Sequence, residues 1–159
     1  MPITILHGPT LSAIVGSGTV SPARFVKYIA LASTVANPTG GWKVVQCIAG
    51  EQPLGISETG TPNAPTDENY GGGIATSTGS TVAKGTSGTG NAWGAGDLIG
   101  IHSLGRNTLL EIGSTITAGA ALGPDAYGRG VPATADAVGA IAKQGGFSGD
   151  LIQVIVEVS

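Results

Sequence analysis

Ser103 is the residue whose surroundings come nearest to a catalytic motif. It stands in the segment Ile101-His-Ser-Leu-Gly105. A serine with a glycine two residues away on each side can occupy a strained strand-to-helix turn and act as a nucleophile. Here Ile101 replaces the first glycine, and no helical pattern follows. We therefore expect Ser103 to be non-catalytic and His102 to be an ordinary strand or turn residue.

Other residue types suited to catalysis or ligand binding are isolated. His7 and His102 are far apart and have no acidic or thiol neighbour at metal-site spacing, and the ten carboxylates are scattered singly. The glycine-rich stretches 79–85 and 88–93 lack the residue order of phosphate and dinucleotide loops. Cys47 is expected to be a small buried apolar side chain. The sequence thus predicts no enzyme, no cofactor and no metal site.

The composition limits the class of partner. The chain has 159 residues and a formal net charge of −3, and charged residues make up 11% of it, compared with about 25% in an average domain. Nucleic-acid binding is not expected, because it needs a basic surface. Residues 1–20 contain no Lys or Arg and are interrupted by glycine and proline, so we expect neither a signal peptide nor a membrane span.

Short runs of Val, Ile and Thr between glycines and prolines indicate strands. The sequence predicts an all-β protein, a small β-sandwich or partly open β-barrel with long Gly/Ser/Thr-rich loops. The clearest strand is 151–158, where every second residue from Ile152 to Val158 shares the core face. The other expected strands are 25–31, 43–49, 98–102, 108–112 and 138–143. Residues 133–143 could instead form a short helix, although Gly139 disfavours one.

One motif occurs twice. The segment 54–60 is followed later by Gly96-Asp-Leu-Ile, and the segment 138–145 is followed by Gly149-Asp-Leu-Ile. A Gly-Asp pair before an apolar run indicates a tight turn, since glycine allows a positive φ and aspartate accepts hydrogen bonds from nearby amides. The sequence therefore predicts a duplicated β-hairpin unit. We expect it to close into a sandwich or small barrel, because two copies are too few for a solenoid.

Two segments are expected to lie outside the packed strands. We expect a single β domain at 23–159, preceded by an extended apolar N-terminal arm at 1–22. The arm would add a strand to another subunit, or else form an ordinary first strand. The insertion at 61–95 contains few large apolar residues. It is expected to be a mobile surface loop or an arm that becomes ordered against a neighbouring subunit.

Five short motifs follow one another in the second half of the chain. They are Gly96-Asp-Leu-Ile, Ile116-Thr-Ala-Gly, the Asp125-x-x-Gly hairpin, Val131-Pro-Ala and Gly149-Asp-Leu-Ile-Gln-Val. This series resembles small capsid decoration proteins of tailed bacteriophages. The resemblance is best over 96–158, weaker over 24–60 and absent over 61–95. It implies a cement protein that sits on the outer capsid surface and clamps neighbouring major capsid subunits.

The same resemblance implies two partners, the major capsid protein and further copies of this chain, with a trimer favoured by analogy. It implies a place in the virion, on the capsid exterior, after synthesis in the host cytoplasm. The arm and the insertion then supply the candidate capsid or intersubunit contacts. These candidates are Ile3, Ile5, Leu6, Leu11, Ile14, Tyr70 and Trp93.

Two other functions are kept as alternatives. The first is a carbohydrate- or receptor-binding β-sandwich on a virion or cell surface, whose aromatic side chains would stack on sugars, although tryptophan is as often a core residue. The aromatic candidates are Tyr28, Trp42, Tyr70, Trp93 and Tyr127. The second is a hydrolase built around Ser103, which the incomplete motif disfavours.

Overall fold

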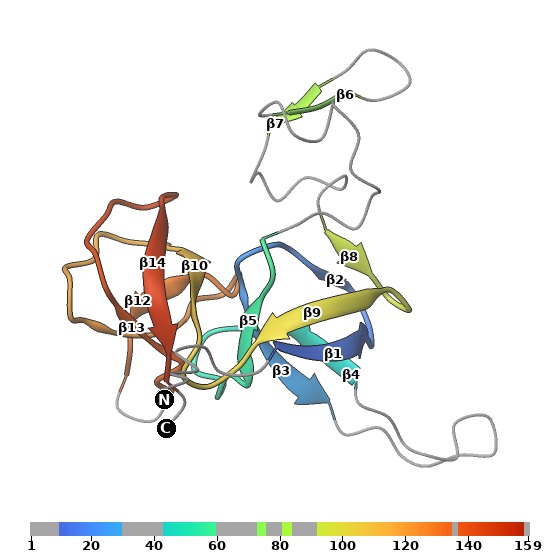
Figure 1. The fold of residues 1–159 in the computed structure, drawn as a ribbon, viewed down its shortest axis with the longest axis horizontal. Helices are drawn as coiled ribbons and strands as arrows, with labels where there is room; N and C mark the ends of the chain where they lie inside the picture. Colours follow the sequence, from blue (N-terminus) through green and yellow to red (C-terminus); the bar gives the residue numbers. More distant parts are fainter. Residues whose placement is uncertain are drawn as a thin grey trace, which may run out of the picture.

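The computed structural model is built from short β-strands (Figure 1). It describes residues 10–29, 43–59, 73–75, 81–83, 92–134 and 137–157. These residues form a closed barrel, a five-stranded sheet and two small pairs of strands. The all-β class predicted from the sequence is confirmed. No helix long and apolar enough to cross a bilayer occurs in the described ranges.

The first unit is a barrel closed in the order β1-β4-β3-β5-β9. Its strands are β1 Thr10–Val15, β3 Phe25–Ile29, β4 Lys43–Gln46, β5 Gly55–Ser57 and β9 Leu98–His102. Neighbouring strands are antiparallel except β1 and β4, which are parallel. Two further pairs join β2 Thr19–Val20 to β8 Trp93–Gly94, and β6 Gly73–Ala75 to β7 Thr81–Ala83.

The second unit is an antiparallel sheet in the order β10-β14-β13-β11-β12. Its strands are β10 Asn107–Glu111, β11 Ala121–Pro124, β12 Gly130–Pro132, β13 Ala140–Ala142 and β14 Leu151–Val156. A parallel bridge between Ile112 and Gly130 joins its two edges, and the Gly113 amide donates a hydrogen bond to the Gly130 carbonyl at 2.9 Å. The sheet is therefore a nearly closed barrel, which we call the second barrel.

Both barrels follow one pattern of strand pairing. The pairs β1–β9, β3–β4, β3–β5 and β5–β9 correspond to β10–β14, β11–β12, β11–β13 and β13–β14. The parallel β1–β4 contact corresponds to the Ile112–Gly130 bridge, and β2–β8 corresponds to the Ile116–Gly146 bridge. The duplicated unit is thus a whole five-stranded barrel, and the predicted hairpin unit was too small.

Matching the two registers makes residues of the first barrel equivalent to residues of the second. The equivalent pairs used below are Ala13 and Leu110, Ile14 and Glu111, Arg24 and Ala120, Phe25 and Ala121, Val44 and Gly130, Pro53 and Val138, Leu54 and Gly139, Leu98 and Leu151, and Ile99 and Ile152. The sequences of the two barrels differ at most of these positions.

Equivalent core positions compensate for each other in size. The first barrel has Ala13 and Val44 in its core, and the second has Leu110 and Gly130. A Cβ atom built on Gly130 would lie 2.6 Å from Cδ2 of Leu110. The leucine therefore fills the space that a side chain at position 130 would need, as close packing of a core requires.

The predicted strands are close to the observed ones. β9 matches the expected bounds, β10 is shifted by one residue from 108–112, and β4 ends before the expected residue 49. β3 covers the described part of 25–31. β13 lies inside 138–143, so the alternative helix over 133–143 is wrong.

The facing predicted for the last strand is confirmed for β14. Every second residue from Ile152 to Val156 is buried, whereas Leu151 and Gln153 are exposed. Position 158, also assigned to the core face, lies outside the described residues.

The predicted N-terminal arm at 1–22 has the wrong C-terminal boundary. β1 pairs with β4 and β9 and so completes the first barrel, while β2 pairs with β8. Ala13 and Val15 are buried in the core, because alternate residues of a strand point inward. Residues 10–20 therefore belong to the packed structure and not to an arm. Residues 1–9 lie outside the described ranges.

The predicted insertion at 61–95 is described only at 73–75, 81–83 and 92–95. Its last residues pack against the first barrel, since Trp93 and Gly94 form β8, which pairs with β2, and Trp93 lies in the core of that barrel. The remainder of this prediction falls outside the described residues.

The two barrels meet at a buried ion pair. Arg24 is 1% exposed, and its Nη1 lies 2.5 Å from Oε2 of Glu111, whose side chain is 14% exposed. Backbone hydrogen bonds flank the pair. The Glu111 amide donates to the Ala23 carbonyl at 3.1 Å, and the Phe25 amide donates to the Gly128 carbonyl at 2.8 Å. Phe25 also joins the core cluster of the second barrel, so polar and apolar contacts together hold the junction.

Two glycines allow the barrels to approach closely. A Cβ atom on Gly139 would lie 2.7 Å from Cε1 of Phe25, and one on Gly128 would lie 2.8 Å from Cγ of Gln46. Gln46 is held there, because its Nε2 donates to the Tyr127 carbonyl at 2.9 Å. The junction thus depends on small residues in the second barrel.

The size compensation in the cores predicts a non-additive pair of substitutions. Leu110→Ala should destabilise the protein by about 2–5 kcal/mol because it leaves a cavity, and Gly130→Val by about 1–3 kcal/mol because it overfills the core. The double variant gives the second barrel the same Ala and Val that the first barrel has at the equivalent positions. It should therefore lose less stability than the sum of the two single losses. Urea denaturation measures the three free energies of unfolding, and additive values would show that the two positions do not share space.

The ion pair at the junction predicts a second coupled pair. Arg24→Met leaves the Glu111 carboxylate with little solvent and no partner, and should cost about 3–5 kcal/mol. Adding Glu111→Leu removes the unpaired charge and should recover most of that loss. Thermal and urea unfolding of the single and double variants test this. A double variant as unstable as Arg24→Met would mean that the ion pair does not account for the loss.

Candidate functional site

The Gly-Asp turn of the first barrel is fixed by hydrogen bonds. Gly96 has a φ of 93°, a conformation that favours glycine. Oδ2 of Asp97 accepts a hydrogen bond from the Gly94 amide at 2.7 Å, and the Asp97 amide donates to the Gly94 carbonyl at 3.0 Å. Val15 lies at the end of β1. The Gly96 amide donates to the Val15 carbonyl at 2.8 Å, and the Val15 amide donates to the Asp97 carbonyl at 3.0 Å. The turn is therefore anchored to the barrel.

The Gly-Asp turn of the second barrel repeats this geometry. Gly149 has a φ of 94°. Oδ2 of Asp150 accepts from the Phe147 amide at 2.8 Å, and the Asp150 amide donates to the Phe147 carbonyl at 3.0 Å. The Gly149 amide donates to the Ile112 carbonyl at 2.8 Å, and the Ile112 amide donates to the Asp150 carbonyl at 3.0 Å. The roles predicted for glycine and aspartate in this motif are confirmed in both copies.

A leucine that points to solvent follows each turn. Leu98 is 68% exposed and Leu151 is 46% exposed, whereas the next residues, Ile99 and Ile152, are each 1% exposed. Strand alternation puts the leucine and the isoleucine on opposite faces. The turn geometry explains why Gly and Asp occur in both motifs, and core packing explains why Ile does. Neither explains why both motifs have a leucine, because its side chain is exposed. Phe147, 72% exposed, adds an apolar side chain to the second turn.

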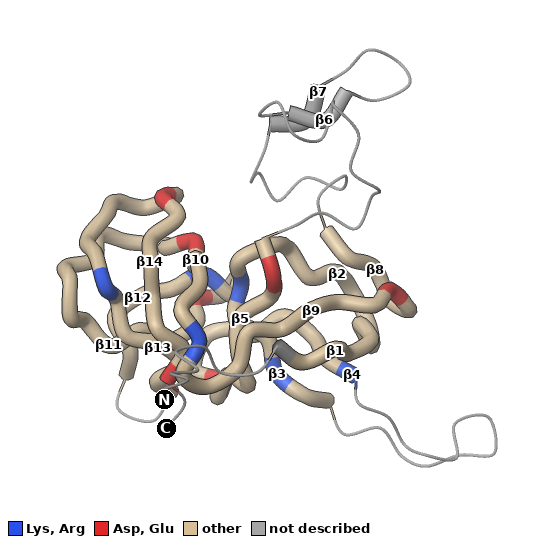
Figure 2. Tube along the Cα trace, viewed as in Figure 1, with Lys and Arg blue, Asp and Glu red and all other residues tan. Residues whose placement is uncertain are grey.

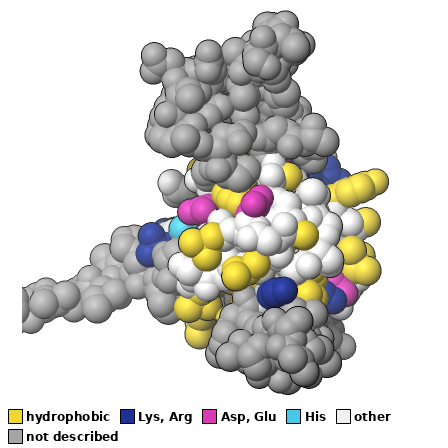
Figure 3. All heavy atoms as spheres, turned by 90° about the vertical axis from the view of Figure 1, so that its right-hand side faces the viewer, with side chains coloured by type: hydrophobic (Ala, Val, Ile, Leu, Met, Phe, Trp, Pro, Cys, Tyr) yellow, Lys and Arg dark blue, Asp and Glu magenta, His cyan; other side chains and the backbone are white. Residues whose placement is uncertain are grey.

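The other exposed apolar side chains are not repeated in this way. Among the described residues, the large ones are Ile14, Tyr28, Ile48, Leu104 and Tyr127. Figure 3 shows hydrophobic side chains scattered among polar ones on one face of the molecule, and Figure 2 shows charged residues thinly spread over both barrels. Isolated exposed apolar residues are normal on protein surfaces. The two leucines stand out because equivalent positions carry the same exposed side chain.

The predicted contact residues differ in where they lie and how exposed they are. Ile3, Ile5, Leu6 and Tyr70 lie outside the described residues. Ile14 is 40% exposed on β1, and Leu11 is half-buried against the core of the first barrel. Trp93 is 3% exposed and belongs to that core, because β8 pairs with β2 beside the barrel. The contact role predicted for Trp93 is wrong.

The aromatic platform expected for sugar binding loses Trp93, which is buried in the core of the first barrel. Trp42 and Tyr70 lie outside the described residues. Tyr28 on β3 and Tyr127 in the β11–β12 turn are 38% and 64% exposed. The Tyr127 ring is covered by a cation, since the guanidinium of Arg129 lies 5.3 Å from its centroid. These two tyrosines come from different barrels.

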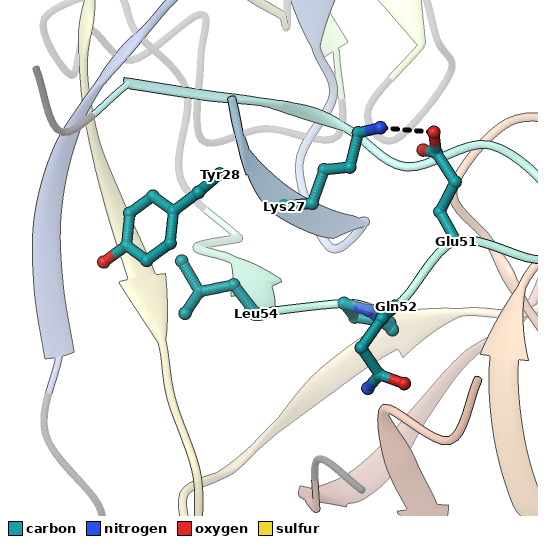
Figure 4. Close-up of a pocket in the computed structure, with 6 residues that line it drawn as sticks. Lys27, Tyr28, Glu51, Gln52 and Leu54 are labelled. Carbon is teal, nitrogen blue, oxygen red and sulfur yellow. Dashed lines mark hydrogen bonds and ion pairs between the residues drawn. The ribbon is translucent and has the colours of Figure 1, made fainter. Parts of the chain in front are cut away.

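A hollow of about 490 Å³ lies beside β3 (Figure 4). It is lined by Lys27, Tyr28, Glu51, Gln52, Pro53 and Leu54. Lys27 and Glu51 form an ion pair with each other, so the hollow offers a ligand mainly amide and apolar contacts. A second hollow of about 250 Å³ lies between residues 49–50 and the β11–β12 turn, and small apolar residues make up most of its lining.

The described structure does not place Ser103 in a nucleophile elbow. Ser103 is 7% exposed and lies in the turn from β9 to β10, where the Arg106 amide donates to its carbonyl at 3.1 Å. This turn leads into a strand, whereas a nucleophile elbow leads into a helix. Among the described residues, no group of three or more His, Cys, Asp or Glu could hold a metal ion.

Cys47 is buried, as predicted. Burial, reinforced by the nearby charge of Glu51, raises the pKa of its thiol to about 12. The thiol therefore stays protonated at neutral pH and is a poor nucleophile.

The sequence reasoning missed Leu98, Leu151 and Phe147 as surface residues. A signal for the leucines was present. The period-two pattern of 151–158 places Ile152 in the core, so Leu151 must face the other side. The repeated motif then transfers the same facing to Leu98. Phe147 gives no such signal, because its exposure follows from the turn geometry.

His102 predicts a pH dependence of stability. Burial, and then the charge of Arg106, lower the pKa of His102 below its ordinary value of 6.5, with Glu58 opposing them. The unfolded chain therefore binds the proton more readily than the folded one. The free energy of unfolding should be highest above about pH 6.5 and fall as the pH drops below it.

The control is His102→Gln, in which this dependence should be absent. Glu51 contributes to the pH dependence only at a lower pH than His102. Burial raises the pKa of Glu51, but hydrogen bonds from Lys27 and the Ile48 amide outweigh burial and leave it below 4.5. Urea titrations between about pH 8 and 5.5 isolate the histidine effect. An equal loss of stability in both proteins over this range would contradict the assignment to His102.

Comparisons with known proteins complete this description. No protein-family model matches the chain, and no curated protein sequence matches it. A similar solved structure is that of the head fiber gp8.5 N base in bacteriophage phi29. The two share 18% sequence identity and superpose with a TM-score of 0.48, over 94% of this chain and 93% of that chain.

Proposed function

We propose that this chain is a structural virion protein that binds the outer surface of a phage capsid. In this proposal it stabilises the shell by clamping neighbouring major capsid subunits. The observation that carries the proposal is the exposed leucine that follows the Gly-Asp turn in both barrels, Leu98 and Leu151.

A repeated surface fits a repeated partner. Two barrels on one chain present the same turn and the same exposed leucine twice, so the chain suits a partner that also offers one site more than once. A shell of identical subunits is such a partner. Once one turn is bound, the second binds intramolecularly, and the combined affinity can exceed either single affinity by about 10²–10⁴-fold.

The chemistry of the turns suits contact with another protein. Burial of an exposed leucine side chain contributes about 1.5–3 kcal/mol. The preceding residues, Asp97 and Asp150, each use Oδ2 to accept a hydrogen bond inside the turn. The turn can therefore keep the same shape before and after binding. A rigid apolar contact of this kind loses little entropy on association.

The sequence resemblance to capsid decoration proteins supports the same proposal. The Gly-Asp-Leu-Ile motifs that carry it are the residues that build both turns and place both leucines. If the proposal holds, the protein is made in the host cytoplasm and acts on the capsid exterior, with the major capsid protein as its partner.

Substitution of the leucines tests the proposal. Leu98→Ser and Leu151→Ser should each weaken binding to undecorated, expanded heads of the cognate phage by about 10²–10⁴-fold, because each leaves only one turn engaged. The double variant should not bind measurably. Cosedimentation and electron microscopy of the mixtures measure the bound fraction.

Leu104→Ser is the matched control. Leu104 is 58% exposed and is not repeated in the second barrel, so its loss should leave binding unchanged. All variants should keep the unfolding temperature of the parent protein. Parental affinity in both single variants, or no binding of the parent protein to heads, would overturn the proposal.

A further inference from the structure

The first barrel has a preformed hollow beside β3, which we call the β3 hollow. Its volume of about 490 Å³ lies within the range of about 300–1,000 Å³ that is usual for small-molecule sites. The residues that line it are Lys27, Tyr28, Glu51, Gln52, Pro53 and Leu54. The segment 51–54 is held against β3, because the Leu54 amide donates to the Val26 carbonyl at 2.7 Å. A hollow with fixed walls needs little reorganisation to accept a ligand.

The second barrel forms the same strands without these side chains. Four lining residues of the β3 hollow have equivalents that carry no functional group. The equivalent pairs are Lys27 and Gly123, Tyr28 and Pro124, Glu51 and Ala137, and Leu54 and Gly139. Because the same strand pairing forms with either set of residues, the fold does not require the side chains that surround the β3 hollow.

A turn gives the match between Glu51 and Ala137. The Glu51 amide donates to the Ile48 carbonyl, and the Ala137 amide donates to the Thr134 carbonyl, both at 3.2 Å. Ile48 and Thr134 are equivalent, because each follows the last paired residue of its strand by two positions. After this turn the first barrel has one residue more than the second, Gln52. The segment that forms one wall of the β3 hollow is therefore longer in the first barrel and carries a carboxylate there.

One side of the β3 hollow is apolar. Figure 4 shows the Tyr28 ring and the Leu54 side chain on this side, with the pair formed by Lys27 and Glu51 on the other. Tyr28 is 38% exposed, so a ligand can reach its ring. The face of an aromatic ring is electron-rich and attracts the C–H bonds on one face of a sugar ring, which carry a partial positive charge. Tyr28 and Leu54 thus form a surface on which a sugar ring can stack.

The opposite side of the β3 hollow is polar and has no net charge. Lys27 and Glu51 form an ion pair, and their side chains are 32% and 24% exposed. An ammonium group has three protons and a carboxylate has about four lone-pair sites, more than one ion pair uses. Both groups can therefore also bond to ligand hydroxyls. An anionic ligand would face Glu51 and a cationic one would face Lys27, so the hollow favours an uncharged ligand rich in hydroxyl groups.

We propose that the β3 hollow binds a neutral saccharide. One face of a sugar ring lies on Tyr28 and Leu54, and its hydroxyl groups bond to Lys27 and Glu51. The described residues of the second barrel lack these side chains at the equivalent positions, so the two barrels differ in this activity. The β3 hollow contains neither of the leucines that follow the Gly-Asp turns. Saccharide binding is therefore a second function, and this proposal does not depend on binding to a capsid.

A glycan array and an NMR titration of the full chain test the proposal. The array should carry neutral hexose and N-acetylhexosamine oligosaccharides beside sialylated and sulfated ones, and we expect only neutral glycans to bind. Titration of the ¹⁵N-labelled protein with the best neutral glycan should shift mainly the amide signals of residues 27–28 and 51–54. This mapping uses the unaltered protein, so it does not depend on the folding of a variant.

Two substitutions test the two sides of the β3 hollow. Tyr28→Ala removes the stacking surface, and Glu51→Ala removes hydrogen bonds to a charged group. Each should weaken glycan binding by about tenfold or more in the same titration. Alanine suits position 51, because Ala137 occupies the equivalent position in the second barrel. Tyr28→Phe keeps the ring and should bind like the parent protein.

Tyr127→Ala is the matched control, because Tyr127 is 64% exposed and lies outside the β3 hollow. It should bind glycans like the parent protein, and all variants should keep the parental unfolding temperature. A parent protein that binds no glycan or only charged ones, shifted signals far from the hollow, or full binding by Tyr28→Ala would overturn the proposal. A chain that binds glycans and fails to bind phage heads would reject only the proposed function.

Discussion

The relative placement of the two barrels depends on the ion pair between Arg24 and Glu111. The guanidinium is removed from water, so its charge is tolerable only while the carboxylate faces it. Ser57 supports this geometry, because its Oγ accepts from the Arg24 amide at 3.0 Å and donates to the Ser21 carbonyl at 2.7 Å. With the arginine fixed, Phe25 reaches the core of the second barrel, and the two β-units become one packed body.

Because the barrel occurs twice, equivalent positions show which residues the fold requires and which ones only the surface uses. Both barrels keep the Gly-Asp turns and the strand registers, yet their cores use different residues of matching total size, such as Ala13 with Val44 and Leu110 with Gly130. A position that is alike in both copies and is not required by the turn or the core carries information about partners. The exposed leucines after the turns are such positions.

Much of the fold could be predicted from the sequence, because local patterns determine it. The alternation in β14 and the Gly-Asp turns depend on neighbouring residues only. Long-range pairing could not be predicted. That β1 closes a barrel against β9 depends on contacts across more than half of the chain. Local patterns therefore predict an arm in place of β1 and a surface position for Trp93. The candidate site can be predicted in part, since the repeated motif is visible in the sequence and strand alternation places its leucine opposite the buried isoleucine.

The pairing of β1 with β9 also has a consequence for the order of folding. The loop between β1 and β9 is roughly twice as long as the one between β10 and β14, and each doubling of a loop adds about 0.6 kcal/mol of closure entropy. The strands of the second barrel also come from a shorter stretch, residues 107–156, than those of the first barrel, residues 10–102. The second barrel can therefore form early and serve as a template on which Phe25 and the late-closing first barrel assemble.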